Sequence, residues 1–228
     1  MEKYDTPVKD VLNIPGINTL TEDEKALIEN NSNIVNYNTR DVIIKQNTRT
    51  SHVMFIKSGL VKVYKEGRNE KVIILQIARP GDFIGLLSLL GDKIYHYSAS
   101  SLSKSQVIFI DVGVFNEIVS NNGFFAAQLM KQISKEGLHM LDKLMNNAHK
   151  QLPGRIADVL LFFSKNIYNS NVFELPMTRR ELAEFACTTK ESFIRTLAEF
   201  QHDRIINLNK RRVDIISMDI LQTLSRLG

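Results

Sequence analysis

The sequence has a single cysteine, Cys187, and no tryptophan. One cysteine cannot form an internal disulfide, and by itself it cannot hold a zinc ion or an iron–sulfur cluster. Redox chemistry through cysteine clusters is therefore not expected. Low-complexity and densely charged tracts are also missing, so the chain of 228 residues is expected to fold throughout, as two domains.

Long hydrophobic runs are absent as well. The longest uncharged apolar run, FIGLLSLLG at residues 83–91, has about half the length that a membrane-spanning helix needs. The N-terminus is acidic and contains proline, without the basic and then apolar order of a signal peptide. These two features predict a cytoplasmic protein without a membrane partner.

The chain has only a small excess of positive charge. The net charge is +4, and residues 150–228 contain 12 Lys and Arg against 9 Asp and Glu, so most of the excess lies in the last third. A mildly basic C-terminal module suits phosphate backbones, although an excess of this size is also common on an ordinary solvated surface.

Short alternating runs fill residues 33–111 and predict strands. The breaks between them carry turn residues, as in Arg79-Pro80-Gly81-Asp82, and their spacing of about ten residues favours an antiparallel sandwich or barrel. In residues 60–65 the apolar positions alternate with lysine, which predicts one buried face and one wet face. The six predicted strands are NIVNY, DVIIK, HVMFIK, LVKVYK, KVIILQIA and QVIFID.

From about residue 122 to 150 the apolar spacing changes to three and four, which predicts one long helix. A narrow seam of the coiled-coil kind runs along it, and we expect this seam to join two copies of the chain. A second reading is that the helix packs on its own sandwich, because Phe124, Phe125, Leu129 and Leu141 offer further apolar surface; both can hold. The seam is formed by Met130, Ile133, Gly137, Met140, Leu144 and Asn147.

Pro153-Gly154 interrupts the chain after this helix and predicts a domain boundary. We therefore expect a first domain at 1–121, the long helix at 122–150 and a second domain at 151–228. A helical pattern resumes at residues 155–168, and a short extended stretch follows at 173–175.

Residues 178–197, TRRELAEFACTTKESFIRTL, predict two short helices with a tight connection. Thr178 and Glu181 have the spacing of a capping box, and Thr189 can cap the second helix. On that second helix Phe193, Leu197 and Phe200 share one face. The opposite side, which we name the outer face, carries Glu191, Ser192, Arg195 and Glu199.

Such a pair matches a helix-turn-helix, whose second helix enters the DNA major groove. Arginine can fork to guanine O6 and N7, and a carboxylate can accept from cytosine N4, so Glu191 and Arg195, one turn apart, can address a single G·C step. The plain alternative is a surface ion pair of about 0.3 kcal/mol between these two residues.

The tail supports the first interpretation. RIINLNKRRVDIIS predicts two strands, at residues 205–208 and 212–216, around a basic turn with Lys210 and Arg211. This is the pattern of a wing, whose cations can lie on phosphates beside the groove and give salt-dependent affinity without sequence information.

At this point the chain resembles the bacterial cAMP receptor protein and fumarate/nitrate reduction regulator (CRP/FNR) superfamily over nearly its full length. The resemblance implies an α+β protein with an N-terminal β jelly-roll sensor of the cyclic-nucleotide-binding type, a dimerisation helix and a C-terminal winged helix-turn-helix. It implies base contacts by Glu191 and Arg195, supported by Lys190 and Ser192, and backbone contacts by Thr178 and Arg179. Ile194 stands where family members usually carry Ser or Gly, so a base contact made there by a hydroxyl is lost.

The same resemblance locates an effector pocket at Gly85, Leu86, Leu87, Tyr97, Ser98 and Ala99. Cyclic-nucleotide binders carry a ribose-binding Glu at the place of Leu86 and a phosphate-binding Arg at the place of Tyr97. Without these charged partners we expect neither cAMP nor cGMP to be the ligand. The cysteines of the family's [4Fe-4S] branch are missing too. Its haem-binding branch makes His139 a candidate axial ligand, with a surface histidine as the ordinary alternative.

The sequence gives little support to an enzyme. Ser101-Leu102-Ser103-Lys104 has the Ser-x-x-Lys spacing without its companion motifs, and Glu136 and His139 form only one copy of a metal motif that requires two. The expected partners are palindromic double-stranded DNA, a second copy of the chain, RNA polymerase and an unidentified small-molecule effector. The competing hypothesis is a sensor module that acts through protein–protein contacts.

Overall fold

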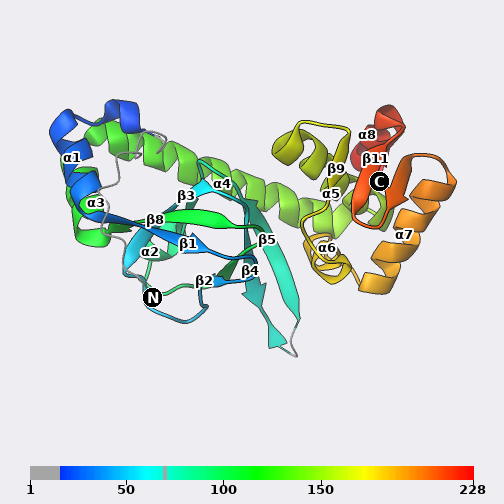
Figure 1. The fold of residues 1–228 in the computed structure, drawn as a ribbon, viewed down its shortest axis with the longest axis horizontal. Helices are drawn as coiled ribbons and strands as arrows, with labels where there is room; N and C mark the ends of the chain where they lie inside the picture. Colours follow the sequence, from blue (N-terminus) through cyan, green and yellow to red (C-terminus); the bar gives the residue numbers. More distant parts are fainter. Residues whose placement is uncertain (1–15, 69–70) are drawn as a thin grey trace. The chain divides into compact units, whose positions relative to one another are not determined.

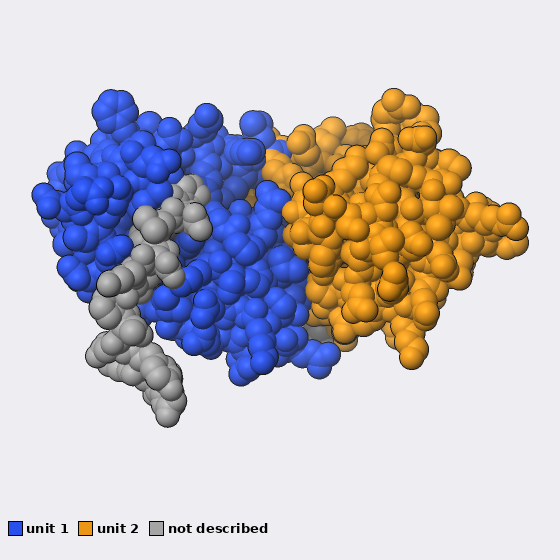
Figure 2. Space-filling model, turned by 45° about the horizontal axis from the view of Figure 1, so that its top comes forward, with its two compact units in different colours: residues 1–71, 75–138 blue, residues 72–74, 139–228 orange. Residues whose placement is uncertain are grey.

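The computed structural model describes residues 16–68 and 71–228 (Figure 1). These residues fall into two compact units, one made of residues up to 71 with 75–138, the other of 72–74 with 139–228 (Figure 2). The division lies inside the long helix and not at Pro153-Gly154. The N-terminal segment in which we sought a signal peptide lies outside the described residues.

Two four-stranded sheets form the first unit, except that residues 72–74 of the second sheet belong to the second unit. Pairing is antiparallel in every strand pair for which a register is given. The six strands expected from alternation are all present. The first sheet has the order β1 (Ser32–Tyr37), β8 (Ser105–Asp111), β3 (His52–Ser58), β6 (Phe83–Ile84). The second has the order β2 (Val42–Ile44), β7 (Ser98–Ser101), β4 (Val61–Glu66), β5 (Val72–Ala78).

Two of these strands carry no sequence signal. β7 reads Ser-Ala-Ser-Ser, and β6 has only two residues, so neither shows the β-branched alternation of an ordinary strand. In β4 the alternation is as expected, because Val61 and Val63 are buried while Lys62 and Lys65 between and after them are not.

The helices of this unit share one apolar core with the first sheet. They are η2 (Ile17–Thr19), α1 (Glu22–Asn30), α2 (Leu86–Leu90), α3 (Val112–Asn121) and the beginning of α4 (Gly123–His149). The change from strand to helix comes at Val112, about ten residues earlier than the sequence suggested. The sequence analysis placed the start of helical structure at Asn122. In the structure this residue has an extended backbone and separates two helices, α3 and α4. Its side-chain oxygen accepts from the Phe125 amide and its Nδ2 donates to the Thr19 carbonyl, so Asn122 starts the long helix.

The first turns of α4 are fixed by the core of this unit. Phe125 and Leu129 are buried, and Phe125 lies edge-on to Phe115, with ring centroids 5.9 Å apart. Phe124 and Leu141 were expected to share this packing, but they are 80% and 59% exposed. The helix therefore uses a narrower face toward its own sandwich than the sequence suggested, because Phe124 points away from the face that carries Phe125 and Leu129.

The second unit contains α5 (Leu152–Leu161), the π-helical η4 (Phe162–Tyr168), β9 (Val172–Glu174), α6 (Arg179–Phe185), α7 (Lys190–His202), β10 (Ile206–Asn209), β11 (Arg212–Ile215) and α8 (Met218–Leu227). The strands form a small antiparallel sheet of order β10-β11-β9. Gly154 allows α8 to approach α5, because a side chain there would meet the Leu224 carbonyl at 2.9 Å.

Candidate nucleic-acid interface and effector region

Capping side chains fix where α6 and α7 begin. The Thr178 hydroxyl accepts from the Glu181 amide while the Glu181 carboxylate accepts from the Thr178 amide, which is the reciprocal capping box expected. The Thr189 hydroxyl accepts from the Ser192 amide and so caps α7. Between the helices Cys187 adopts a left-handed φ of 52°, which lets the chain turn within a few residues.

One side of α7 holds the helix on the unit and the other side faces outward. Phe193, Leu197 and Phe200 are buried, as their spacing predicted. Glu191, Arg195 and Glu199 on the outer face are exposed, while Ser192 is half-buried and accepts from the Thr189 hydroxyl at 3.0 Å. Ser192 therefore belongs partly to the cap. Lys190 is exposed at the first turn.

Glu191 and Arg195 have the right spacing for an ion pair, yet no such pair forms within the described part of the chain. The neighbouring helix gives the comparison, because Arg180 and Glu184 have the same spacing in reverse order and are joined at 3.0 Å between Nε and Oε1. The surface-pair alternative for Glu191 and Arg195 is therefore not the arrangement seen. The Glu191 carboxylate and the Arg195 guanidinium therefore remain available to another molecule.

The turn between β10 and β11 brings cations together. Lys210 stands at its tip with φ of 54°, and its carbonyl accepts from the Arg179 guanidinium. Arg211 Nε donates to the Leu175 carbonyl at 3.0 Å. Partial burial and the charge of Arg211 both lower the pKa of Arg179. Among the described residues no carboxylate pairs with Arg179 or Arg211, so two like charges are held close together without a counter-ion.

Sequence reasoning assigned Thr178 and Arg179 to the same task, and their settings differ. The Thr178 hydroxyl is engaged in its capping box, where it also donates to the Glu181 carboxylate at 2.9 Å. Arg179 instead joins the start of α6 to the wing turn, 31 residues further along the chain. This long-range bond leaves no trace in the sequence pattern, so the positioning role of Arg179 could not be found from spacing.

Most of the seam along α4 is apolar and exposed. Met130 and Leu144 are 63% and 64% exposed, Met140 is also exposed, and Ile133 is half-buried. A side chain added at Gly137 would meet nothing within 4 Å, so this position is open. Phe124, Leu138, Leu141 and Met145 add exposed apolar surface on the same helix. Surface of this extent on one element is typical of an interface.

Asn147, the last residue of the expected seam, has a different partner. Its Nδ2 donates to the Cys187 sulfur at 3.2 Å. One turn earlier, Lys143 Nζ lies 4.1 Å from the centroid of the Phe185 ring and donates to the Ile74 carbonyl at 2.7 Å. Burial lowers the pKa of Lys143 to about 8, against a smaller opposing effect of Cys187. This end of α4 therefore contacts the helix-turn-helix.

The six residues of the expected effector pocket all belong to the first unit, but they differ in how far they are buried. Gly85, Ser98 and Ala99 are buried, Tyr97 is half-buried, and Leu87 is exposed. Leu86, at the place of the family's ribose-binding Glu, packs into the apolar core with Phe83 and Leu89. It is therefore directed to the core.

Tyr97 fills the region with its own side chain. Its hydroxyl oxygen accepts from the Gly85 amide at 2.9 Å, and burial raises its pKa, with the charge of Glu136 adding to the rise. Burial raises the pKa of Glu136 as well, and Asp82 adds to that effect. Glu136 bonds Gln132 at 3.3 Å, one turn away on α4. The surroundings of Tyr97 thus contain carboxylates where a cyclic phosphate would require a cation.

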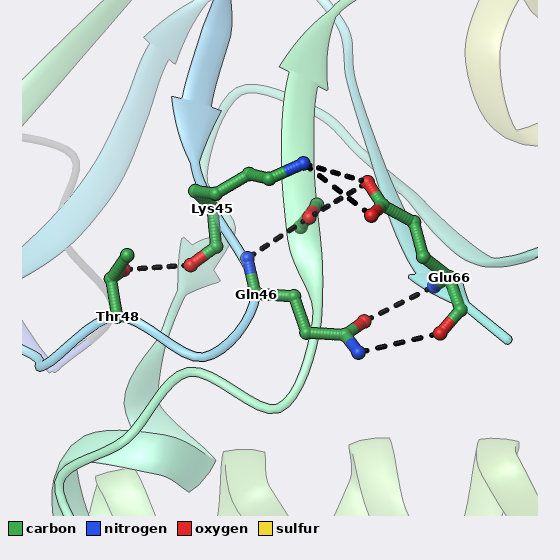
Figure 3. A network of polar contacts seen from close by, with 5 residues as sticks. Lys45, Gln46, Thr48 and Glu66 are labelled. Carbon is green, nitrogen blue, oxygen red and sulfur yellow. Dashed lines mark hydrogen bonds and ion pairs between the residues drawn. The ribbon is translucent and has the colours of Figure 1, made fainter.

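Ser98 is buried in a polar network that the sequence analysis did not predict. Its hydroxyl accepts from the Gln46 amide at 3.0 Å and donates to Glu66 at 3.4 Å. Lys45 Nζ is bonded to the same carboxylate, and Gln46 bridges the backbone of Glu66 in both directions (Figure 3). These residues come from turns after β2 and at the end of β4, at separations that no local motif reports.

His139 is exposed on α4. In the part of the chain that the structure describes, no group of three or more His, Cys, Asp or Glu side chains gathers as a metal site. An exposed histidine without an enclosing apolar setting does not fit a haem, so the haem hypothesis gains no support from these residues. Among the described helices none is long and apolar enough to cross a bilayer.

Two protein-family models match the sequence of this chain. The cyclic nucleotide-binding domain matches residues 34–122, and the Crp-like helix-turn-helix domain matches residues 154–224. The fumarate and nitrate reduction regulatory protein of Vibrio cholerae is 25% identical over 71% of this chain and 66% of its own length. The cAMP-activated global transcriptional regulator CRP of Salmonella typhimurium is 24% identical over 78% and 86%.

A solved structure of FixK2 from Bradyrhizobium japonicum has the same fold, with a TM-score of 0.79, 20% identity and coverage of 86% of this chain and 98% of that one. The two family models lie in the expected order on either side of α4. Members of the CRP/FNR family are transcriptional regulators and not enzymes. Domain order, relatives and fold agree: the chain belongs to the CRP/FNR family of DNA-binding transcription regulators.

Proposed function

We propose that the chain acts as a homodimer on an inverted-repeat operator, with one α7 helix in each of two successive major grooves. A dimer with twofold symmetry requires a site with the same symmetry, and half-sites about 34 Å apart suit one turn of DNA. A signal in the sensor unit would shift the equilibrium between two arrangements of the recognition helices. RNA polymerase is the expected partner at the promoter.

The unpaired outer face of α7 is the observation that carries the proposal. Glu191 and Arg195 are exposed one turn apart and form no ion pair with each other, although Arg180 and Glu184 do so on the next helix. Free guanidinium and carboxylate groups at this spacing complement the guanine and cytosine edges of one base pair. Lys210 with Arg179 and Arg211 supplies the charge for phosphates beside the groove.

The dimer is supported by the exposed seam. Met130, Met140 and Leu144 present an apolar stripe along one helix, and Gly137 has room for close approach of a second helix. A monomer would leave this surface in water, at a cost of about 25 cal/mol for each Å² of apolar area.

Selection of bound sites from random DNA tests nucleic-acid binding, palindromy and spacing together. The selected pool should contain an inverted repeat with half-site centres separated by one helical turn or a multiple of it. A pool without a shared sequence would contradict the proposal, and so would a pool enriched in single half-sites. The Arg195→Ala variant should select a pool that has lost preference at one position of each half-site.

We further propose that the effector is not a cyclic nucleotide. The Gly85 amide is engaged by Tyr97, the Ser98 hydroxyl is engaged by Glu66, and Leu86 is turned into the core. A cyclic phosphate would have to displace these bonds without gaining a cation at position 97. Calorimetric titration with cAMP and with cGMP should give no heat of binding, and micromolar binding of either nucleotide would overturn this assignment.

A further inference from the structure

Next to the outer face, α7 carries one large apolar side chain that is exposed. Ile194 is 43% exposed, between the exposed Glu191 and Arg195 in the sequence. The buried side of the helix is already occupied by Phe193, Leu197 and Phe200, so Ile194 does not belong to the core of the unit. Ala198, one turn further along, is also exposed and leaves the side of Ile194 open.

Local stability does not account for an isoleucine at this place. A β-branched residue is a poorer helix former than Lys, Glu or Ala, and it leaves apolar area in water when it is exposed. Exposure alone does not single out Ile194, since Ile220 on α8 is also exposed. Ile194 differs because it lies beside the exposed Glu191 and Arg195 on the helix that would enter the groove, where a complex would cover it. The partner must offer an apolar group within a surface that otherwise suits charged side chains.

The DNA major groove has one such group on its base edges. The other edges present hydrogen-bond donors and acceptors, whereas thymine presents a 5-methyl group. Along the helix axis Ile194 lies about 4.5 Å beyond Glu191 and about 1.5 Å before Arg195, at 1.5 Å per residue. Because it also points about 100° away from Arg195 around the helix, it would reach a base pair next to the one that Arg195 reads.

We propose that Ile194 is a specificity-determining residue that selects thymine, through contact with the 5-methyl group, at the base pair beside the Glu191–Arg195 step. This inference rests on the proposed function, since it requires α7 in the major groove. It adds an apolar contact to the two charged ones, so each half-site would carry a required thymine next to a G·C pair.

Deoxyuridine provides the test, because it lacks only the methyl group and keeps every hydrogen-bonding edge of thymine. Each thymine of the selected operator is replaced in turn, symmetrically in both half-sites, and the affinity of the full-length protein is measured. Loss of one buried methyl corresponds to about a four-fold weaker contact. Wild type should therefore lose roughly four-fold for each half-site at one thymine position and keep its affinity elsewhere.

Ile194→Ala should bind the thymine and deoxyuridine operators equally at that position. The control is Ile220→Ala, the same truncation of an exposed isoleucine on α8, which should keep the wild-type sensitivity to the methyl group. If no thymine position is sensitive in wild type, or if Ile194→Ala keeps the sensitivity, the inference is wrong while the proposed function stands. If wild type selects no sequence at all, both are wrong.

Discussion

Charged residues of the second unit divide into those that have an internal partner and those that do not. Arg180 has its carboxylate and Lys150 has Asp158, at 2.7 Å. Arg195 has no ion-pair partner among the described residues. Because paired groups contribute mainly to the fold and unpaired ones are free to bind, substitutions at the two kinds of position should separate affinity for DNA from stability.

Arg195→Ala should weaken binding to the selected operator by roughly 1 to 3 kcal/mol and relax the preference at one G·C pair. Lys210→Ala should weaken binding to all sequences alike and reduce the dependence on salt by about one unit of slope. Affinities for operator and for random DNA at several salt concentrations distinguish the two.

The control for both variants is Arg226→Ala, which removes the same charge from an exposed position on α8. It should leave the ratio of operator to random binding unchanged. Equal loss on operator and random DNA for Arg195→Ala would reject its assigned role as a base reader.

Because of Lys143, we expect the free energy of unfolding to change with pH above about pH 8. Its pKa in the folded protein is about 8, whereas the unfolded chain holds the same proton up to about 10.4. Between these values the unfolded state binds more protons, so the free energy of unfolding contributed by this group increases as the pH rises. The increase should be roughly 2 kcal/mol from pH 8 to pH 10.

Urea unfolding of wild type and of Lys143→Met at pH 7, 8, 9 and 10 isolates this effect, because all other groups titrate in both proteins. The stability of wild type relative to the variant should be constant below pH 8 and rise above it. A difference that stays flat to pH 10 would show that the Lys143 ammonium is solvated in the folded protein.

The Tyr97 hydroxyl accepts a hydrogen bond from the buried Gly85 amide, so Tyr97→Phe should leave a buried donor unsatisfied. The expected loss in the free energy of unfolding is about 1 to 3 kcal/mol. Chemical denaturation measures it, with Tyr64→Phe as a control on the exposed side of β4. Unchanged stability of Tyr97→Phe would mean that water replaces the hydroxyl, and that the region has room for a ligand.

Some helices and strands could be predicted from the sequence and others could not. Both helices of the helix-turn-helix, α6 and α7, were predictable, because their capping residues and apolar spacing are local signals. The wing strands were also found, within a residue or two of β10 and β11. The serine strand β7, the helix α3 and the last helix α8 were not found, since each depends on partners distant in the sequence that supply the burial or the break.

The candidate sites also differ in whether local sequence signals were enough to predict them. The outer face of α7 could be assigned from helical geometry, because one element carries all its residues. The surroundings of Ser98 could not, since Gln46, Glu66 and Ser98 come from three separate segments that only the folded sheet brings together. Asn147 was assigned to the seam by spacing alone, and its bond to Cys187 depends on a neighbouring element that spacing does not describe.

At the scale of the whole molecule, we expect a single charged substitution in the apolar seam of α4 to prevent formation of the proposed dimer. Leu144→Glu should convert the dimer to a monomer in sedimentation experiments, because a carboxylate would have to be buried without a partner between two helices. Operator affinity should fall with it. Leu227→Glu, which changes an exposed leucine on α8, is the control and should remain dimeric. A wild-type protein that sediments as a monomer would contradict the proposed assembly directly.

In the proposed dimer, the one thiol of the chain, at the turn between α6 and α7, would provide two identical attachment points for spectroscopic labels. Nitroxides at Cys187 of both protomers would report the separation of the two DNA-reading heads as a distribution of spin–spin distances. Candidate effectors could then be screened by whether they narrow or displace that distribution, without knowing the operator or any target gene.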